Sequence, residues 1–321
     1  MPPPPFRVDP LIDDLVGRCP FPAAGTPLVC AVSGGADSLA LLVLATAAGC
    51  RVTAVHVDHG LRPGSAAEAE VVASAAARYG SAFQSERVVV ADGPNLEARA
   101  RAARFEVLGP DAATGHTADD QAETVLGNLL RGSGVDGLAG MRAGPRHPLL
   151  ALRRSETVAL CRHEKLEPVD DPSNRDPRFL RNRIRAELLP LCSELAGRDI
   201  VPVLARQAGL LAGDAELLQA VAELVDPVDA KALAAAPDAV ARRALRAWLT
   251  GDGPYPPSLD AVERVLEVAR GERKATEIEG GIRVSRSRGR LSQSPVSSKA
   301  SSAALASAIG SAGDRTDTVA P

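Results

Sequence analysis

Residues 28–44 read Leu-Val-Cys-Ala-Val-Ser-Gly-Gly-Ala-Asp-Ser-Leu-Ala-Leu-Leu-Val-Leu. The apolar run at 28–32 predicts a buried strand, and the apolar residues after Ser38 predict a helix over 38–48. The glycine-rich turn between them presents free backbone N–H groups and the positive end of a helix dipole, which suits a phosphate group. The stretch therefore predicts an α/β fold, with either an anion site or an ordinary strand-to-helix turn at 33–38.

The side chains of this turn suit a phosphate and its cation. Gly34 and Gly35 tolerate positive φ and let an anion approach the backbone. The hydroxyls of Ser33 and Ser38 can donate to phosphate oxygens, and Asp37 could hold a divalent cation such as Mg²⁺. The spacing matches neither G-x-x-x-x-G-K-[ST] nor G-x-G-x-x-G. We therefore interpret the turn as a phosphate loop of another kind.

Strand and helix patterns alternate along the first half of the chain. Strands are expected at 28–32, 51–57, 83–90 and 111–114, and helices at 38–48, 66–79, 95–108 and 118–131. Such alternation predicts a parallel sheet covered on both faces by right-handed crossovers, a Rossmann-like nucleotide-binding domain. Ligands of these sheets lie beyond the carboxyl ends of the strands.

The second half has a different pattern. Long helical stretches are expected at 198–225, 232–249 and 258–270, followed by a hairpin at 276–291 that turns at Gly280-Gly281. The Ser/Ala-rich end has no apolar period and predicts disorder. We expect these segments: an N-terminal extension with a short helix (1–25), a catalytic domain (26–192), a linker helix (193–225), a smaller, mostly helical domain (226–292) and a disordered tail (293–321).

Composition limits the class of protein. The 321 residues are 45% hydrophobic. The 37 Lys and Arg against 40 Asp and Glu give a net charge of −3, so the overall charge does not indicate a nucleic-acid partner. Aromatic residues are only 2%, which disfavours a base-stacking platform. Five cysteines without a C-x-x-C pair favour a reducing compartment over a zinc or disulfide scaffold. With neither a signal peptide nor a long apolar run, we expect a soluble, cytoplasmic protein.

A His-Val-Asp-His-Gly sequence at 56–60 ends the second predicted strand. His56 and Asp58 are two residues apart and share a face, so they could hold a metal. Alternatively, their side chains form hydrogen bonds at the sheet edge, or the backbone here binds a purine ring beside the phosphate loop.

Residues 115–123 read Gly-His-Thr-Ala-Asp-Asp-Gln-Ala-Glu and enter a predicted helix. Thr117 as N-cap with an acidic first turn explains part of this motif, but Glu123 lies a turn deeper. Asp120 and Glu123 are three residues apart, so both carboxylates can face one ligand, and paired carboxylates suit an ammonium group. His116 lies at the strand end, where a ligand of the sheet would meet it.

Two groups of arginines form basic strips. The first has five arginines in eleven residues, namely Arg175, Arg178, Arg181, Arg183 and Arg185. It could grip phosphates, although a solvated helix face would have the same composition. The second strip is Arg283, Arg286, Arg288 and Arg290, and we expect the last three to share a strand face. Two separated strips favour an extended polyanion as partner.

Together these motifs resemble the N-type ATP pyrophosphatase (PP-loop) superfamily and, within it, the tRNA(Ile)-lysidine synthetase family. The likeness covers about residues 26–190. The matching pieces, in order, are 33–38, 56–63, 97–105 with Arg101 and Arg104, 115–123, 130–134, 137–141, 171–174 and 181–185.

The resemblance implies an ATP-dependent ligase that modifies the wobble cytidine of tRNA(Ile) with the anticodon CAU. ATP adenylates O2 of the base and releases pyrophosphate, and the ε-amine of free lysine then attacks C2 and displaces AMP. The product, lysidine, changes the codon and amino-acid specificity of the tRNA from methionine to isoleucine. A homodimer is also implied.

The same resemblance assigns roles to residues. The implied ATP-binding residues are Ser33, Gly34, Gly35, Ala36, Asp37, Ser38, Val57, Gly115 and His116. The implied catalytic residues are Asp37, His116, Asp120 and Glu123. Asp37 would lie near Mg²⁺, and lysine would bind Asp120 and Glu123. The tRNA or the activated intermediate would contact Arg178, Arg181, Arg183 and Arg185.

Some features depart from the family or fit other functions. Asp170 stands where the family more often has Glu, Phe105 stands where Tyr is usual, and longer members carry further C-terminal modules. Another PP-loop ligase, such as a tRNA thiolation enzyme or NAD synthetase, is an alternative, disfavoured by the missing C-x-x-C pairs and glutaminase domain. A non-catalytic adenine-nucleotide sensor is a second alternative, disfavoured by the carboxylate pair and the basic strips.

Overall fold

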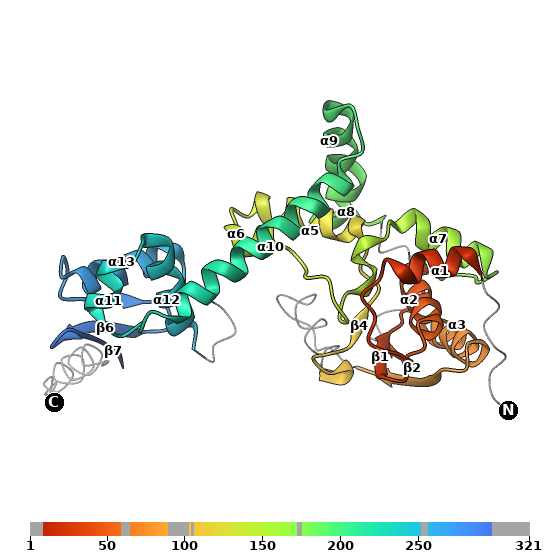
Figure 1. The fold of residues 1–321 in the computed structure, drawn as a ribbon, viewed down its shortest axis with the longest axis horizontal. Coiled ribbons are helices and arrows are strands. Elements are labelled where there is room, and N and C mark those ends of the chain that lie inside the picture. Colours follow the sequence, from red (N-terminus) through yellow and green to blue (C-terminus); the bar gives the residue numbers. More distant parts are fainter. Residues whose placement is uncertain are drawn as a thin grey trace, which may run out of the picture. The chain divides into compact units, whose positions relative to one another are not determined.

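The computed structural model describes residues 9–58, 65–88, 103, 106–171, 175–251 and 256–296. It forms two compact units, Met1–Ala215 and Glu216–Pro321 (Figure 1). The first unit holds the phosphate loop and the carboxylate pair. Among the described residues, no helix is long and apolar enough to cross a membrane.

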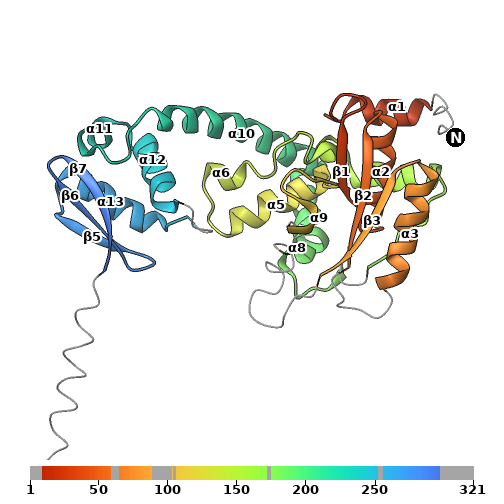
Figure 2. The ribbon, with the colours of Figure 1, turned by 90° about the horizontal axis from the view of Figure 1, so that it is seen from below.

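The first unit is built on a four-stranded parallel sheet. Its strands are β1 (Pro27–Ala31), β2 (Arg51–Asp58), β3 (Ala82–Arg87) and β4 (Ala113–Thr114), in the order β3-β2-β1-β4. Figure 2 shows β1, β2 and β3 side by side. Ala31 pairs with Val55 of β2 on one side and with Thr114 of β4 on the other. Strands β2 and β3 thus extend the sheet on one side of β1, and β4 extends it on the other. The ligand crevice is therefore expected at this switch point, between the ends of β1 and β4.

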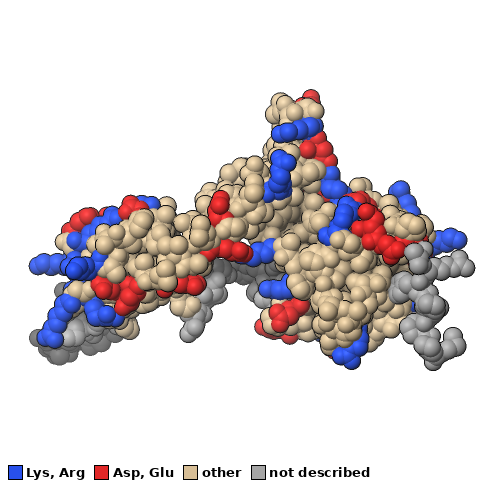
Figure 3. Space-filling view, in the orientation of Figure 1, with Lys and Arg blue, Asp and Glu red and all other residues tan. Residues whose placement is uncertain are grey.

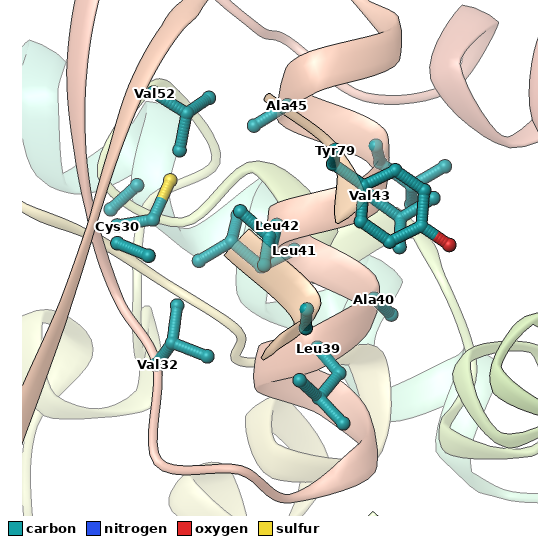
Figure 4. Close-up of a cluster of buried hydrophobic side chains, with 14 of the residues drawn as sticks. Cys30, Val32, Leu39, Ala40, Leu41, Leu42, Val43, Ala45, Val52 and Tyr79 are labelled. Carbon is teal, nitrogen blue, oxygen red and sulfur yellow. The ribbon is translucent and has the colours of Figure 1, made fainter. Parts of the chain in front are cut away.

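Four helices belong to the main core of this unit: α1 (Pro10–Gly17), α2 (Ala36–Ala47), α3 (Ser65–Arg78) and α7 (Arg154–His163). Residues 39–45 of α2 are 0% exposed, because the helix packs against α1, α7 and the sheet at once. Figure 4 shows Cys30, Val32 and Val52 on the strand side facing Leu41 and Leu42 of α2. Such a helix is apolar all round, as its sequence is.

The predicted parallel α/β fold is confirmed. The strands expected at 28–32, 51–57 and 111–114 correspond to β1, β2 and β4, and the strand expected at 83–90 ends at Arg87. The opposite face of the sheet packs against Leu108 and Ala112. Most of the helix expected at 95–108 lies outside the described residues.

A second group of helices in this unit carries the charged residues of the predicted site. Its elements are α5 (Ala118–Leu130), α6 (Val135–Leu138), η1 (Pro148–Ala151), α8 (Leu180–Arg183), the π-helical turn η3 (Ile184–Leu188), α9 (Leu189–Ala196) and the part of α10 (Val201–Glu223) up to Ala215. Ala122 and Leu126 of α5 pack with Ile184, Leu189 and Val201 in a separate small core. This core fixes α8 and η3 beside α5.

The second unit combines helices with an antiparallel sheet. Its elements are α11 (Ala230–Ala235), α12 (Asp238–Thr250), α13 (Leu259–Arg270), β5 (Ala275–Ile278), β6 (Ile282–Ser287) and β7 (Arg290–Pro295). The sheet order is β5-β6-β7, and Leu245, Leu266 and Val284 are buried at 0% exposure. The predicted helix at 232–249 is two helices, because Pro237 stands between α11 and α12 and α12 starts anew after it.

The expected hairpin and its arginine strip need correction. The turn at Gly280 and Gly281 is present, with φ of +79° and +68°. A second turn follows at Arg288 and Gly289, with φ of +49° and +78°, and leads into β7. The prediction that Arg286, Arg288 and Arg290 share a strand face is therefore wrong, since the chain reverses between the first and the last of them. β7 also continues past 293, where the tail was expected to begin, and 297–321 lie outside the described residues.

Candidate active site

The phosphate loop joins β1 to α2 and is held by its own hydroxyl groups. Gly34 has φ of +87°, a conformation that favours glycine. The Oγ atom of Ser38 donates to the carbonyl of Gly35 at 2.8 Å and accepts from the N–H of Ser33 at 3.1 Å. Because α2 begins at Ala36, the N–H groups of Ala36 and Asp37 have no partners within the helix, whereas those of Ser38 and Leu39 donate to the carbonyl of Gly35. The loop thus has the backbone geometry of an anion site.

Two segments distant in the sequence close around the loop. A Cβ atom at Gly115 would lie 2.5 Å from the carbonyl oxygen of Asp37, so the end of β4 touches the start of α2 backbone to backbone. On the other side, the N–H of Val169 donates to the carbonyl of Gly34 at 3.0 Å. The structure therefore brings the predicted loop at 33–38 and Gly115 together, and His116 follows Gly115 along the chain. Val169 was not identified from the sequence.

Asp37 is bound by two residues of α7. The Oγ1 atom of Thr157 donates to its Oδ1, and the Nε atom of Arg154 lies 3.3 Å from its Oδ2. Burial raises the pKa of Asp37, and the hydrogen bond from Thr157 and the charge of Arg154 partly oppose that shift. Neither partner was identified from the sequence. One signal was present: Arg153 and Arg154 stand at a helix N-terminus, where the dipole disfavours cations.

The predicted carboxylate pair is buried on α5. Asp120 is 6% exposed and Glu123 is 2% exposed. The Oδ2 atom of Asp120 accepts from the N–H of Thr117 at 2.8 Å and so caps α5, as the sequence predicted. Its Oδ1 atom lies 2.7 Å from Nη2 of both Arg154 and Arg181. Asp120 therefore accepts a hydrogen bond at the start of the helix with one oxygen and forms ion pairs with the other.

Glu123 is contacted by three arginines. Its Oε1 atom lies 2.7 Å from Nε of Arg185 and 3.1 Å from Nη1 of Arg154. Its Oε2 atom lies 2.8 Å from Nε of Arg181 and 3.0 Å from Nη2 of Arg185. Both oxygens are thus engaged, and buried charges of this kind persist only when they are paired.

We call these six side chains the charge cluster: Asp37, Asp120, Glu123, Arg154, Arg181 and Arg185. Its three carboxylates face three guanidinium groups, so it carries no net charge when all six are ionised. Burial raises the pKa of Asp120, but the charges of Arg154 and Arg181 outweigh it, and the pKa lies below its usual value. The carboxylate thus remains ionised at neutral pH.

His116 lies directly after β4 and is oriented by Thr114. The Oγ1 atom of Thr114 lies 2.7 Å from Nδ1 of His116 and 2.8 Å from Nδ1 of His147. The two rings meet edge to face with 5.3 Å between centroids. His116 therefore holds the predicted position at the strand end, and His147 is a neighbour that the sequence did not indicate.

The end of β2 is partly described. His56 is 2% exposed, and its Nδ1 atom lies 3.1 Å from the carbonyl of Val32. Asp58 forms a long ion pair with Arg87, at 4.0 Å. The contact of His56 is of the kind that the hydrogen-bond alternative describes, and the metal and purine alternatives stay predictions. Val57 is half-buried on the opposite face from His56, and His59 and Gly60 lie outside the described residues.

The structure separates the four arginines that were predicted to contact tRNA. Arg181 and Arg185 belong to the charge cluster. Arg178 pairs with Asp176 at 2.6 Å and Arg183 with Glu187 at 3.0 Å, both on the surface. Figure 3 shows acidic and basic side chains interspersed on the visible face, so the surface drawn there has no continuous basic patch.

A small cavity adjoins the charge cluster. It has a volume of about 200 Å³, is partly open to solvent and is lined by Asp119, Glu123, Arg154, Arg185, Leu189, Pro190, Ser193 and Val201. Its lining combines charged groups from α5, α7 and η3 with apolar groups from α9 and α10. It offers a partly open space beside Glu123.

A parallel sheet whose first strand leads into a Ser-Gly-Gly-x-Asp-Ser loop, closed by a glycine from the switch-point strand, defines a PP-loop ATP-binding protein. Residues 13–192 match the PP-loop domain family, and residues 229–292 match the TilS substrate binding domain. The chain belongs to the tRNA(Ile)-lysidine synthase family, whose members are ATP-dependent ligases.

Individual relatives support this assignment. The chain is 40% identical to the tRNA(Ile)-lysidine synthase of Nocardia farcinica over 295 residues, which cover 84% of this chain and 92% of the relative. It is 46% identical to that of Rhodococcus erythropolis over 243 residues, which cover 70% and 74% of the two chains. The U34-tRNA thiolase NcsA of Methanococcus maripaludis has a similar fold, with a TM-score of 0.50 at 17% identity over 63% of this chain and 78% of that one.

The comparisons confirm several predictions. The fold class, the family, the ligase activity, the use of ATP and the binding of tRNA(Ile) are as expected from the sequence. The alternatives of another PP-loop ligase and of a nucleotide sensor are therefore set aside.

Proposed function

We propose that this chain builds lysidine in two steps in which the charge cluster links the two half-reactions. In the first, O2 of the wobble cytidine attacks the α-phosphorus of ATP, and the bond to pyrophosphate breaks. In the second, the ε-amine of lysine attacks C2, AMP leaves with the C–O bond electrons, and the amine loses a proton. The observation that carries this proposal is Arg154, which contacts Asp37 of the phosphate loop and both carboxylates of α5.

The ATP roles rest on the loop geometry. Backbone N–H groups of the loop, together with the hydroxyls of Ser33 and Ser38, would hold the pyrophosphate and stabilise its charge as it leaves. Val57, Gly115 and His116 would contact the nucleotide at the ends of β2 and β4. Asp37 fits a Mg²⁺ ligand, because Mg²⁺ is usually held by one or two carboxylates together with substrate phosphates. When bound there, Mg²⁺ would neutralise phosphate charge, and Asp37 would exchange its contact with Arg154 for the cation.

Lysine would bind at Asp120 and Glu123. Hydrogen bonds between a carboxylate and an ammonium group are charge-assisted, because both partners are charged, and each contributes roughly 1.5–3 kcal/mol. Both carboxylates are in place on the same face of α5, each in contact with arginine side chains. A bound lysine would therefore replace some of these arginine contacts.

Arg178 and Arg183 are the arginines best suited to the phosphates of tRNA. Both are exposed, and their present partners Asp176 and Glu187 are surface carboxylates, which hold arginine weakly. A phosphate can therefore take over either guanidinium. The tRNA would also reach the second unit, where residues 229–292 match a substrate-binding domain. With 26–192 as the catalytic domain, we place the reaction in the cytoplasm, where tRNA is found.

We also propose a homodimer that forms through α10. Two leucines seven residues apart are exposed on one face of this helix, Leu210 at 60% and Leu217 at 67%, and Leu224, directly after the end of the helix, is 85% exposed. The opposite face is buried at Ala208, Ala215 and Ala222. Apolar residues at a seven-residue spacing form the seam of paired helices. A second copy of this chain offers the matching seam.

One experiment tests the proposed reaction. The purified protein is incubated with ATP, Mg²⁺, labelled lysine and a transcript of tRNA(Ile) with the anticodon CAU. A transcript of methionine tRNA with the same anticodon is the control. We expect label in the isoleucine transcript only, with one AMP formed for each lysine incorporated. Consumption of ATP without incorporation of lysine would refute the proposal.

A further inference from the structure

Helix α7 contacts the start of α2 through one largely buried face. Three of its residues form this face, Arg154, Thr157 and Cys161, spaced three and four residues apart so that they lie on the same side of the helix. The Sγ atom of Cys161 lies 3.4 Å from the carbonyl oxygen of Ala36, and the other two side chains contact Asp37. Thr157 is 0% exposed and Cys161 is 1% exposed. The first turn of α2, which follows the phosphate loop, is therefore packed against α7.

The two contacts on Asp37 use different oxygens and differ in charge. The neutral hydroxyl of Thr157 donates to Oδ1, and the Nε atom of the Arg154 guanidinium lies 3.3 Å from Oδ2. The carbonyl oxygen of Arg154 is a second acceptor for the Thr157 hydroxyl, at 2.8 Å. Since the hydroxyl has one proton, the negatively charged carboxylate is the preferred acceptor. Asp37 is thus held by a neutral donor on one oxygen and by a cation on the other.

A divalent cation at Asp37 would affect these two contacts differently. It would repel the guanidinium of Arg154, because both carry positive charge, whereas the neutral hydroxyl of Thr157 can stay in place. The χ2 torsion of an aspartate is broad, so a hydrogen bond on one oxygen determines the direction of the other. Carboxylates that bind metal ions are commonly held by such hydrogen bonds from residues outside the ligand set. Thr157 is therefore the contact that can persist when Asp37 binds a cation.

We propose that Thr157 is a positioning residue for the cation that accompanies ATP: its hydroxyl holds Oδ1 of Asp37, so that Oδ2 binds Mg²⁺ in place of Arg154. This inference rests on the proposed role of Asp37 as a Mg²⁺ ligand. On this assignment Thr157 contacts neither the cation nor the nucleotide and acts only through Asp37. Its role could not be read from a local motif, because 120 residues separate Thr157 from Asp37.

The test measures how Mg²⁺ changes the affinity for an ATP analogue whose α- and β-phosphates are joined by a methylene group, so that it cannot release pyrophosphate. Calorimetry gives the Kd once with Mg²⁺ and once with a chelator. Thr157→Val keeps the shape of the side chain and removes the hydroxyl. It should weaken binding about ten- to a hundredfold with Mg²⁺, the usual effect of losing a hydrogen bond that orients a metal ligand, and leave binding with the chelator unchanged. A residue that only stabilised the fold would change both values alike.

Three further variants serve as controls. Thr157→Ser keeps the hydroxyl and should recover most of the affinity measured with Mg²⁺. Thr157→Ala removes the hydroxyl without a methyl group in its place and should repeat the result of Thr157→Val, so that a packing error at this buried position cannot imitate it. Thr46→Val makes the same chemical change within α2, where the hydroxyl donates to the carbonyl of Leu42, and should leave both affinities unchanged. Urea unfolding curves show whether each variant is folded.

A substitution of Asp37 itself separates this inference from the proposed function. Asp37→Asn should abolish the gain in affinity that Mg²⁺ gives. If Thr157→Val keeps this gain while Asp37→Asn loses it, the assignment of Thr157 is overturned. Equal weakening of Thr157→Val with and without Mg²⁺ would also overturn it, because Thr157 would then have a structural role only. If Asp37→Asn keeps the gain, the proposed role of Asp37 as a Mg²⁺ ligand fails instead.

Discussion

Arg154 and Asp37 are in direct contact, with 3.3 Å between Nε and Oδ2. The two Nη atoms of the same guanidinium contact Asp120 and Glu123. One side chain of α7 thus joins the loop that holds ATP to the helix that carries the carboxylate pair. Its removal affects three acids at once.

Replacement of Arg154 by methionine should destabilise the fold strongly. Breaking a buried ion pair by removal of one partner costs about 3–5 kcal/mol, because the remaining charges are left uncompensated. Urea unfolding curves of the variant and the wild-type protein measure the change in the free energy of unfolding. The matched control is Arg183→Met, whose ion pair with Glu187 is exposed and whose loss should have no measurable effect. Equal losses of stability in the two variants would contradict the conclusion that the buried ion pairs of Arg154 stabilise the fold.

Substitution of Gly115 by alanine should disturb the ATP loop. Its Cβ atom would lie 2.5 Å from the carbonyl oxygen of Asp37, and backbone atoms cannot yield as a side chain can. We expect a loss of about 1–3 kcal/mol in the free energy of unfolding and weaker ATP binding, measured by denaturation and by calorimetry. At Gly134, which has φ of −78° and open space around it, alanine should be tolerated. An equally mild result at Gly115 would show that β4 and α2 are not in contact.

Stability should depend on pH through Asp120. Its pKa is lowered in the folded state by Arg154 and Arg181. The stabilisation is therefore present above the unfolded value of roughly 3.9 and is lost as the pH falls through the folded pKa. Acid should thus unfold the wild-type protein with a steeper loss of free energy below about pH 4 than it does Asp120→Asn. Unfolding curves between neutral and acidic pH measure both slopes, and parallel slopes would refute the assignment.

The exposed arginines should set the salt dependence of tRNA binding. Each phosphate contact that is lost lowers the slope of log K against log salt by roughly one. The double variant Arg178→Ala, Arg183→Ala should therefore bind tRNA(Ile) more weakly and with a slope reduced by about two. Arg162→Ala on α7 is an exposed control that should leave the slope unchanged. Filter binding over a range of salt concentrations provides the values.

A charge on the exposed face of α10 should dissociate the dimer. Leu217→Glu places a carboxylate in the centre of the leucine seam, where burial against a second copy would be unfavourable. Light scattering after gel filtration should report a dimer for the wild-type chain and a monomer for the variant. Leu191→Glu, at an exposed leucine of α9, makes the same chemical change elsewhere and should remain dimeric. A wild-type monomer would remove the dimer from the proposal.

The sequence predicted those parts of the site that lie in contiguous motifs. The loop at 33–38 and the pair Asp120 and Glu123 combine local geometry with local chemistry, so each could be recognised without knowledge of the rest. Arg154, Thr157 and His147 could not be found in this way, because their partners are far along the chain and only packing brings them together.

Other differences have local causes. The turn at Arg288 and Gly289 was missed because an arginine in the left-handed region carries no distinct sequence signal. The roles of Arg181 and Arg185 depend on the π-helical turn η3, which shifts the helix register relative to a regular α-helix. Periodicity alone cannot reveal such a shift.

The backbone contact between Gly115 and Asp37 gives the enzyme a mechanical property. A strand end and a helix start that touch without intervening side chains cannot slide independently. His116 and the first turn of α5 follow Gly115 along the chain, so a displacement of the loop is passed directly to them. If pyrophosphate leaves the loop as proposed, the movement would reach Asp120 and Glu123 through this contact and would tell the proposed lysine site that the first step has ended.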